Sequence, residues 1–167
     1  MKSEHLSFAK SINATLAVTF KTPKVALRPE DEPTCLTTKD TDFFEVYVLR
    51  QFFINMSRVV PFRFVAYPED RAYDSDKSFR PLHYHAVVRS DNDAKFKAVA
   101  PRKYATSLRD AYAKVFGHVI MPSEPIWIDD IHRDDPEKCY ESYIFKHYCP
   151  SKHLVTNDDF LKKSIAA

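Results

Sequence analysis

Short runs rich in β-branched and aromatic residues recur along the chain and predict four strands. These runs cover residues 14–20, 59–67, 82–89 and 125–131. Turn-forming or charged segments separate them, and the prolines between 21 and 41 predict a long loop there. Residues 1–12 form a polar lead-in, and residues 90–105 favour neither helix nor strand.

Apolar residues at helical spacing predict three helices between and after these strands. The first covers about 42–57, opens at Asp42 with Glu45 as its capping-box partner, and buries one aromatic face. That face comprises Phe44, Val48, Leu49, Phe52, Phe53 and Met56. The second helix begins at Thr106 or Ser107 and has Gly117 at its C′ position. The third begins at Asp135-Pro136 and ends near Cys149-Pro150.

The order of these elements is βαββαβ followed by a helix, which predicts an α+β fold. We expect a ferredoxin-like antiparallel sheet with its helices on one face, and the last helix beyond it. At 167 residues the chain fits one domain, 1–167, with a core at about 14–149 and a polar tail at 150–167.

The amino-acid composition excludes some classes of binding site and indicates the redox compartment. The only glycine is Gly117, so a glycine-rich phosphate loop of the Walker or Rossmann type is excluded. The net charge of +2 does not by itself require a nucleic-acid partner. Three cysteines without zinc-site spacing indicate free thiols in a reducing compartment. With no apolar leader and no run long enough to span a bilayer, we expect a cytoplasmic protein without a membrane partner.

The third predicted strand carries a pair of histidines on one face. Residues two apart in a strand point the same way, so His83 and His85 project side by side, away from Leu82, Tyr84 and Ala86. Two imidazoles and a carboxylate suit Mn²⁺, or Mg²⁺ with phosphate oxygens completing the shell. Taken alone, such a pair is more often structural than metal-binding.

A third ligand is expected where the second strand ends. Glu69 is our choice, and Asp70, Asp74 and Asp76 are rivals in the same turn. An ordinary solvated acidic turn is an equally good interpretation of any one of them.

The last predicted helix brings Tyr143 beside Tyr140, Lys146 and His147, because residues three and four apart are neighbours on a helix. A phenol with a pKa of roughly 10 is a weak nucleophile at neutral pH. A divalent metal that polarises a phosphate and an ammonium that offsets developing charge would activate it. Simple packing is the simpler role for Tyr140, and a solvated side chain is the alternative for Lys146.

Three motifs together resemble the HUH endonucleases of the rolling-circle replication initiator (Rep) type. They are Leu16-Ala-Val-Thr-Phe20, His83-Tyr84-His85 and Tyr143-Ile-Phe-Lys146, in the family order, and the resemblance covers about 14–147. It implies that His83, His85 and Glu69 hold the metal and that Tyr143 attacks a single-stranded DNA phosphate, with Lys146 neutralising charge. Tyr140 lies three residues away from Tyr143, whereas two-tyrosine members space theirs by four. This spacing favours the single-tyrosine type, with Tyr140 as a second, weaker candidate for the catalytic tyrosine.

The resemblance further implies a site-specific nickase that forms a 5′-phosphotyrosine link and leaves a 3′-hydroxyl to prime replication of a plasmid or phage. Its partner would be single-stranded DNA at a replication origin, including DNA folded as a hairpin, in a bacterial or archaeal cell. Because no helicase domain follows, a host helicase or other replication proteins would unwind the duplex.

Three other functions are compatible with parts of the same sequence. A relaxase or a transposase would use the same chemistry. A ferredoxin-like nucleic-acid-binding module without catalysis would make the histidines incidental and binding independent of metal. A phosphoesterase with two His-x-Thr motifs fits poorly, because His153-Leu-Val-Thr156 has the wrong spacing.

Overall fold

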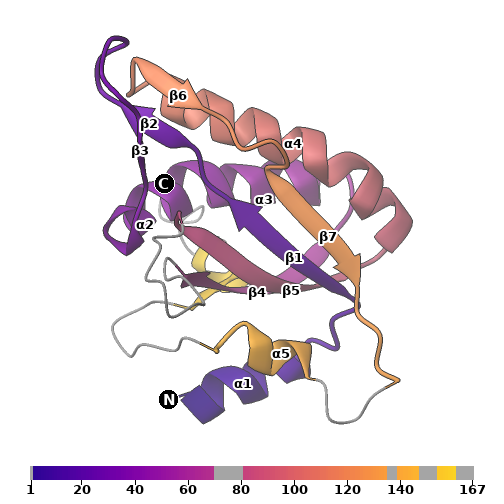
Figure 1. Cartoon of the computed structure of the whole chain (residues 1–167). Coiled ribbons are helices and arrows are strands. Elements are labelled where there is room, and N and C mark those ends of the chain that lie inside the picture. Colours follow the sequence, from indigo (N-terminus) through magenta and orange to yellow (C-terminus); the bar gives the residue numbers. More distant parts are fainter. Residues whose placement is uncertain (1, 70–80, 135–138, 147–153, 161–167) are drawn as a thin grey trace.

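A five-stranded antiparallel sheet forms the centre of the computed structural model, which describes residues 2–69, 81–134, 139–146 and 154–160. The strand order is β7-β1-β5-β4-β8 (Figure 1). The strands are β1 (Leu16–Lys21), β4 (Phe62–Glu69), β5 (His83–Ser90), β7 (Ile126–Asp130) and β8 (Val155–Thr156). Each of the four predicted strands is present, and β5, which carries the two histidines, occupies the middle of the sheet.

A small second sheet stands beyond one end of β1 (Figure 1), and two of its three strands lie within the long loop predicted for residues 21–41. Its order is β3 (Thr34–Cys35), β2 (Lys24–Ala26) and β6 (His118–Ile120). The expectation that Gly117 ends a helix with a left-handed residue is wrong, since its φ is not positive. A Cβ at this position would lie 2.7 Å from Cδ of Pro29 and 2.9 Å from the Leu27 carbonyl oxygen, so close approach of another segment requires the glycine.

The first predicted helix is confirmed as a helical segment from Thr41 to Ser57. It consists of α2 (Thr41–Phe44), a π-helical stretch (Glu45–Leu49) and α3 (Arg50–Ser57). All six side chains of the predicted aromatic face are buried. The capping box expected at Asp42 and Glu45 is wrong: the box forms earlier, between Thr37 and Asp40, and Glu45 is itself buried.

Helix α4 (Asp93–Ala113) begins well before the predicted start at Thr106 or Ser107. The Asn92 side chain accepts a hydrogen bond from the Lys95 amide and caps the helix. One buried stripe runs along its length, formed by Phe96, Ala100, Tyr104, Leu108 and Tyr112. Packing of this stripe outweighs the cost of Pro101 inside the helix. Neither α4 nor another helix in the described ranges is long and apolar enough to cross a membrane.

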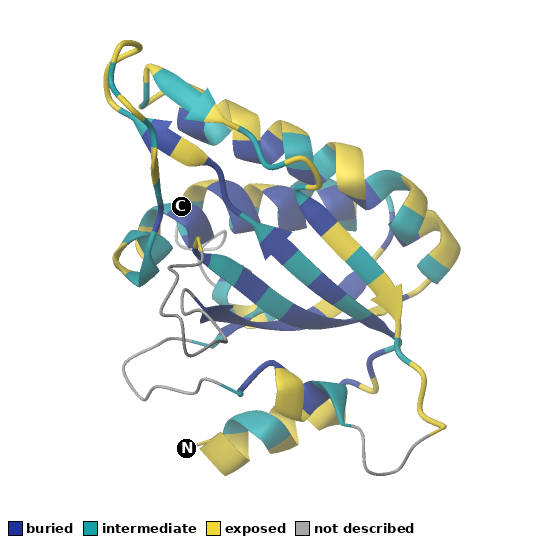
Figure 2. Cartoon of the chain, viewed as in Figure 1, coloured by how far each residue is buried: buried dark blue, intermediate teal, exposed yellow. Residues whose placement is uncertain are grey.

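Helices cover both faces of the main sheet, so the expectation of helices on one face is wrong (Figure 1). The segment 41–57 and α4 cover the larger core. On the opposite face lie α1 (Lys2–Ser11), within the expected polar lead-in, and α5 (Tyr140–Tyr143) (Figures 1 and 2). They cover the smaller core, which includes Ala9, Ile12, Val65, Tyr67, Val87, Ile144 and Phe145. Outward-facing apolar residues of β4 and β5 therefore need this second layer.

The C-terminal segments differ most from expectation. Helix α5 begins at Tyr140, because Cys139 before it is extended (φ −123°, ψ 107°), which breaks any continuous helix from the predicted start at Asp135. Residues 135–138 and 147–153 lie outside the described residues. The expected polar tail contributes to the core: β8 pairs with β4, and Phe160 is buried against Phe53 and Phe64.

Candidate metal and tyrosine site

Pairing of β4 with β5 places a carboxylate opposite the histidine pair. Glu69 lies directly across from His83 in the ladder. Its Oε2 is 3.0 Å from Nε2 of His85 and 3.7 Å from Nε2 of His83. One potential ligand atom from each of the three residues lies within 4.8 Å of the others. Glu69, His83 and His85, which we call the triad, could therefore bind a metal ion, whereas Asp70, Asp74 and Asp76 lie outside the described residues.

The second nitrogen of each imidazole has its own neighbour. Nδ1–H of His83 donates to the Pro81 carbonyl at 2.9 Å. Nδ1 of His85 lies 3.3 Å from Oγ1 of Thr19, which stands opposite His85 on β1. Both Nε2 atoms are thereby directed toward Glu69. Histidines that ligate metals are commonly oriented by such a partner on the other ring nitrogen.

Protonation in the triad suits a cation. Burial acts to raise the pKa of Glu69, but His83, His85 and Lys146 outweigh it and hold that pKa well below its usual value. Burial lowers the pKa of His85 below 6.5, despite the opposing effect of Glu69. At neutral pH the triad thus offers an ionised carboxylate and a neutral imidazole, the forms that coordinate metals.

Tyr143, at the end of α5, and Lys146, in the turn that follows, both contact residues of the triad. The Tyr143 ring packs edge-on against His85, with ring centroids 5.1 Å apart, and 48% of the residue is exposed. Nζ of Lys146 lies 3.8 Å from the centroid of the Tyr143 ring and 3.6 Å from Oε2 of Glu69. A turn after α5, in which the Lys146 amide donates to the Tyr143 carbonyl, brings the lysine back over the ring.

Tyr140 occupies a different environment. It begins α5, is partly buried against the smaller core, and lines a pocket beside the triad. His147, the other neighbour predicted for Tyr143, lies outside the described residues.

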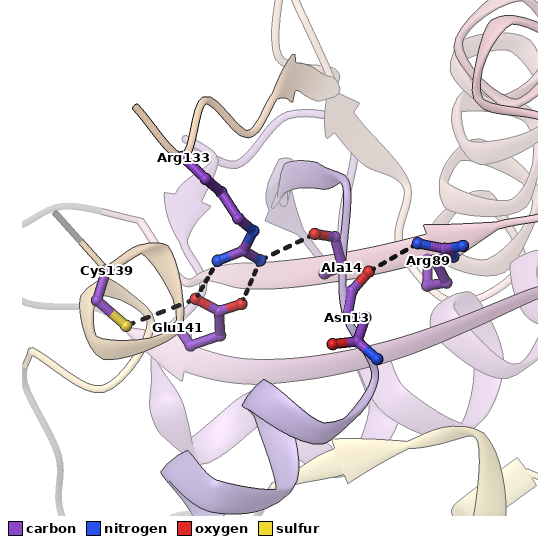
Figure 3. A network of polar contacts seen from close by, with 6 residues as sticks. All are labelled: Asn13, Ala14, Arg89, Arg133, Cys139 and Glu141. Atoms are coloured by element: carbon purple, nitrogen blue, oxygen red, sulfur yellow. Dashed lines mark hydrogen bonds and ion pairs between the residues drawn. The ribbon is translucent and has the colours of Figure 1, made fainter. Parts of the chain in front are cut away.

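An ion pair with one buried partner, Glu141, and one half-exposed partner, Arg133, fixes α5 to the rest of the protein (Figure 3). Nη2 of Arg133 donates to Oε1 of Glu141 at 2.6 Å and to the Ala14 carbonyl at 2.9 Å, and Sγ of Cys139 lies 3.5 Å from Oε2 of Glu141. Glu141 is 1% exposed. Phe145, next to Lys146, is fully buried and packs edge-on against Tyr67.

Sequence reasoning missed Thr19, Trp127, Arg133 and Glu141. The signal for Thr19 and Trp127 was present in the period of two, which places both on one face once their strands are paired. Nothing local marks Arg133 and Glu141 as partners, because the segment between them crosses from the sheet to α5.

Comparisons with known proteins do not identify the chain. No protein-family model, curated protein or solved structure matches it.

Proposed function

We propose that this protein is a metal-dependent endonuclease that nicks and rejoins single-stranded DNA through Tyr143, in the manner of the HUH endonucleases. The observation that carries the proposal is the contact of Tyr143 with both His85 and Lys146, while Lys146 and His85 both approach Glu69. Nucleophile, cation and metal ligands thus form one cluster that the solvent can reach at Tyr143.

The fold supports the same assignment. Four strands of the main sheet correspond to the predicted βαββαβ order: β1 is the first, β4 the second, β5 the third and β7 the fourth. In the sheet they lie side by side in the order fourth, first, third and second. This order is compatible with the ferredoxin-like sheet that we propose, with α1, α5 and β8 as additions. The two histidines lie on β5, the central strand of the sheet, and Tyr143 ends the short helix α5.

In the proposed reaction, the phenolic oxygen of Tyr143 attacks the scissile phosphorus. The phenol proton passes to the solvent and the P–O3′ bond breaks, which gives a 5′-phosphotyrosine link and a 3′ oxygen that takes up a proton to become a free hydroxyl. Bound by the triad, Mn²⁺ or Mg²⁺ would supply Lewis-acid polarisation of the phosphate. Lys146 offsets negative charge on the phenolic oxygen, and reversal of the attack rejoins the strand.

This chemistry fits an initiator of rolling-circle replication. Its substrate is single-stranded DNA at the origin of a plasmid or phage, including origin DNA folded as a hairpin. The 3′-hydroxyl primes synthesis, and a host helicase or other replication proteins unwind the duplex in a bacterial or archaeal cytoplasm. A retained 5′ link on Tyr143 allows the strand to be closed after one round.

The test is formation of a covalent protein–DNA adduct on a denaturing gel. Wild-type protein is incubated with a random pool of single-stranded oligonucleotides in Mn²⁺ or in EDTA. We expect an adduct that requires Mn²⁺ and is lost in Tyr143→Phe. Tyr47→Phe, at an exposed tyrosine on the helical layer, is the matched control and should behave as wild type.

Other outcomes discriminate between functions. An adduct that survives in Tyr143→Phe and disappears in Tyr140→Phe would move the nucleophile to Tyr140. Absence of any adduct, together with DNA or RNA binding that ignores EDTA, would replace the nickase by a nucleic-acid-binding module without catalysis.

A further inference from the structure

A pocket of about 390 Å³ lies beside the triad, between the sheet and α5. Thr19, His85, Trp127 and Asp129 line it from β1, β5 and β7, and Tyr140 and Tyr143 line it from α5. Because one of its walls is the proposed nucleophile, whatever fills the pocket lies next to the reacting phosphate. The volume is within the usual range for small-ligand pockets.

Trp127 gives the pocket a flat and open wall. In the sheet register, Trp127 stands opposite Thr19, and Thr19 stands opposite His85. The three side chains therefore form one row across β7, β1 and β5, with Trp127 two strand spacings, about 10 Å, from the metal ligand. Trp127 is 58% exposed, although apolar residues of the other face of the same strand pack into the larger core. A large exposed ring at the edge of a pocket is a surface for stacking.

The charges around the pocket indicate which part of a nucleotide it takes. None of the described residues that line it is lysine or arginine, and the formal negative charge among them belongs to Asp129. A phosphate would be repelled, whereas the uncharged ring of a base can stack on Trp127. Asp129 lies on the same face of β7 as Trp127, and a carboxylate accepts hydrogen bonds from the exocyclic amino group of a base.

We propose that this pocket binds the base of the nucleotide that flanks the scissile phosphate, stacked on Trp127 and read by Asp129; this inference rests on the proposed nickase function. The preferred base is one with an exocyclic amino group, such as cytosine, over thymine. Trp127 thus contributes affinity, and Asp129 contributes sequence preference. Tyr143, on the α5 side, faces the phosphate attached to that nucleotide.

The chain provides its own reporter, since Trp127 is its single tryptophan. Homopolymers of deoxycytidine and of thymidine, about 12 nucleotides long, serve as probes. Quenching of Trp127 fluorescence reports stacking, and anisotropy of end-labelled DNA reports binding independently of Trp127. We expect deoxycytidine to quench Trp127, and we expect Trp127→Ala to weaken binding by about 5- to 100-fold.

Matched variants separate stacking from damage to the fold. Trp127→Phe keeps an aromatic surface and should retain most of the affinity. Tyr47→Ala removes an equally exposed ring on the helical layer and should change nothing. Wild type should prefer deoxycytidine to thymidine by about 5-fold or more, and Asp129→Asn should reduce this preference.

The outcomes distinguish the pocket from the nickase function. DNA that binds by anisotropy without quenching, and equally well to Trp127→Ala, would overturn the base pocket while leaving the adduct assay to decide the nickase. Equal binding of the two homopolymers by wild type would overturn the role of Asp129. No binding by anisotropy together with no adduct would overturn both proposals.

Discussion

Arg133 and Glu141 tie the segment that leaves β7 to the helix that carries Tyr143. Two hydrogen bonds join them, from Nη2 to Oε1 at 2.6 Å and from Nη1 to Oε2 at 3.5 Å. The same guanidinium also donates to the Ala14 carbonyl. A four-residue helix has little stability of its own. This ion pair, with the buried Phe145 beyond it, therefore determines where Tyr143 stands.

Replacing Arg133 by methionine should release α5. We expect Arg133→Met to lower the free energy of unfolding by about 1–2 kcal/mol, less than for a fully buried pair because the Arg133 side chain is 52% exposed. Adduct formation should fall while Mn²⁺ affinity stays unchanged, because no triad residue is altered. Urea denaturation, the adduct gel and calorimetric titration measure the three quantities.

Two further variants check this interpretation. Arg133→Met with Glu141→Met should recover most of the stability, since no buried charge is then left unpaired. Arg28→Met breaks an exposed ion pair with Asp31 and should leave adduct formation unchanged. Equal loss of adduct in Arg28→Met and Arg133→Met would contradict a specific role for the Arg133–Glu141 ion pair.

The same ion pair predicts that the free energy of unfolding depends on pH. Burial acts to raise the pKa of Glu141, but Arg133 outweighs it and lowers that pKa below its ordinary 4.5. Because the folded pKa is below the unfolded one, the contribution of Glu141 is present above pH 4.5 and is lost as the pH falls through the folded pKa. In Arg133→Met the burial of Glu141 is no longer offset by Arg133 and raises its pKa, so the difference in unfolding free energy between wild type and variant should be largest near neutral pH and should narrow steadily on acidification. A difference that grew on acidification would refute this assignment.

Metal binding should be visible as stabilisation. Mn²⁺ at about 100 times its dissociation constant should add about 2.7 kcal/mol and raise Tm by about 5–10 °C, reversibly with EDTA. Scanning calorimetry of His85→Ala and Glu69→Ala should show no such shift. His118→Ala, at a histidine in the small sheet, should keep it. An unchanged shift in His85→Ala would exclude the triad as the metal site.

Thr19 should tune metal affinity without touching the metal. Thr19→Val removes the hydroxyl beside Nδ1 of His85 and frees the imidazole to rotate. We expect the dissociation constant for Mn²⁺ to rise about 10-fold in calorimetric titration. Thr106→Val, on the exposed side of α4, is the control. If both variants bind Mn²⁺ equally, Thr19 does not orient His85.

Lys146 should promote the reaction without contributing to metal affinity. Lys146→Met removes the cation over the Tyr143 ring, so the rate of adduct formation should fall about 100-fold. Because the same cation lies 3.6 Å from Oε2 of Glu69, its loss should leave Mn²⁺ affinity equal or higher. Lys146→Arg should keep part of the rate. A large loss of Mn²⁺ affinity in Lys146→Met would instead mean that the lysine maintains the structure of the site.

Much of the fold was predictable where one local period dominates. The helical face from Phe44 to Met56 is buried in full, and the four strands occur where β-branched and aromatic runs predict them. The start of α4 was not predictable, because its buried residues are spread over a polar segment that includes Pro101. Its helical form depends on packing of one stripe against the core.

Local sequence patterns also could not predict that the second face of the sheet is covered. Val65, Tyr67 and Val87 are apolar on that side, yet only their assembly in adjacent strands shows a surface that needs covering. The layer that covers it comes from α1 and α5, at opposite ends of the described chain.

By itself the sequence determined that His83 and His85 share a face, since a strand has a period of two, and that the chain lacks a glycine-rich phosphate loop. Tertiary structure decided the rest of the site. The register of β4 on β5 selects Glu69, the order β7-β1-β5 brings Trp127 and Thr19 into line with His85, and the docking of α5 sets Tyr143 and Lys146 over the triad. These contacts join residues far apart in the chain, and pairing and packing of whole elements, which no local period encodes, bring them together.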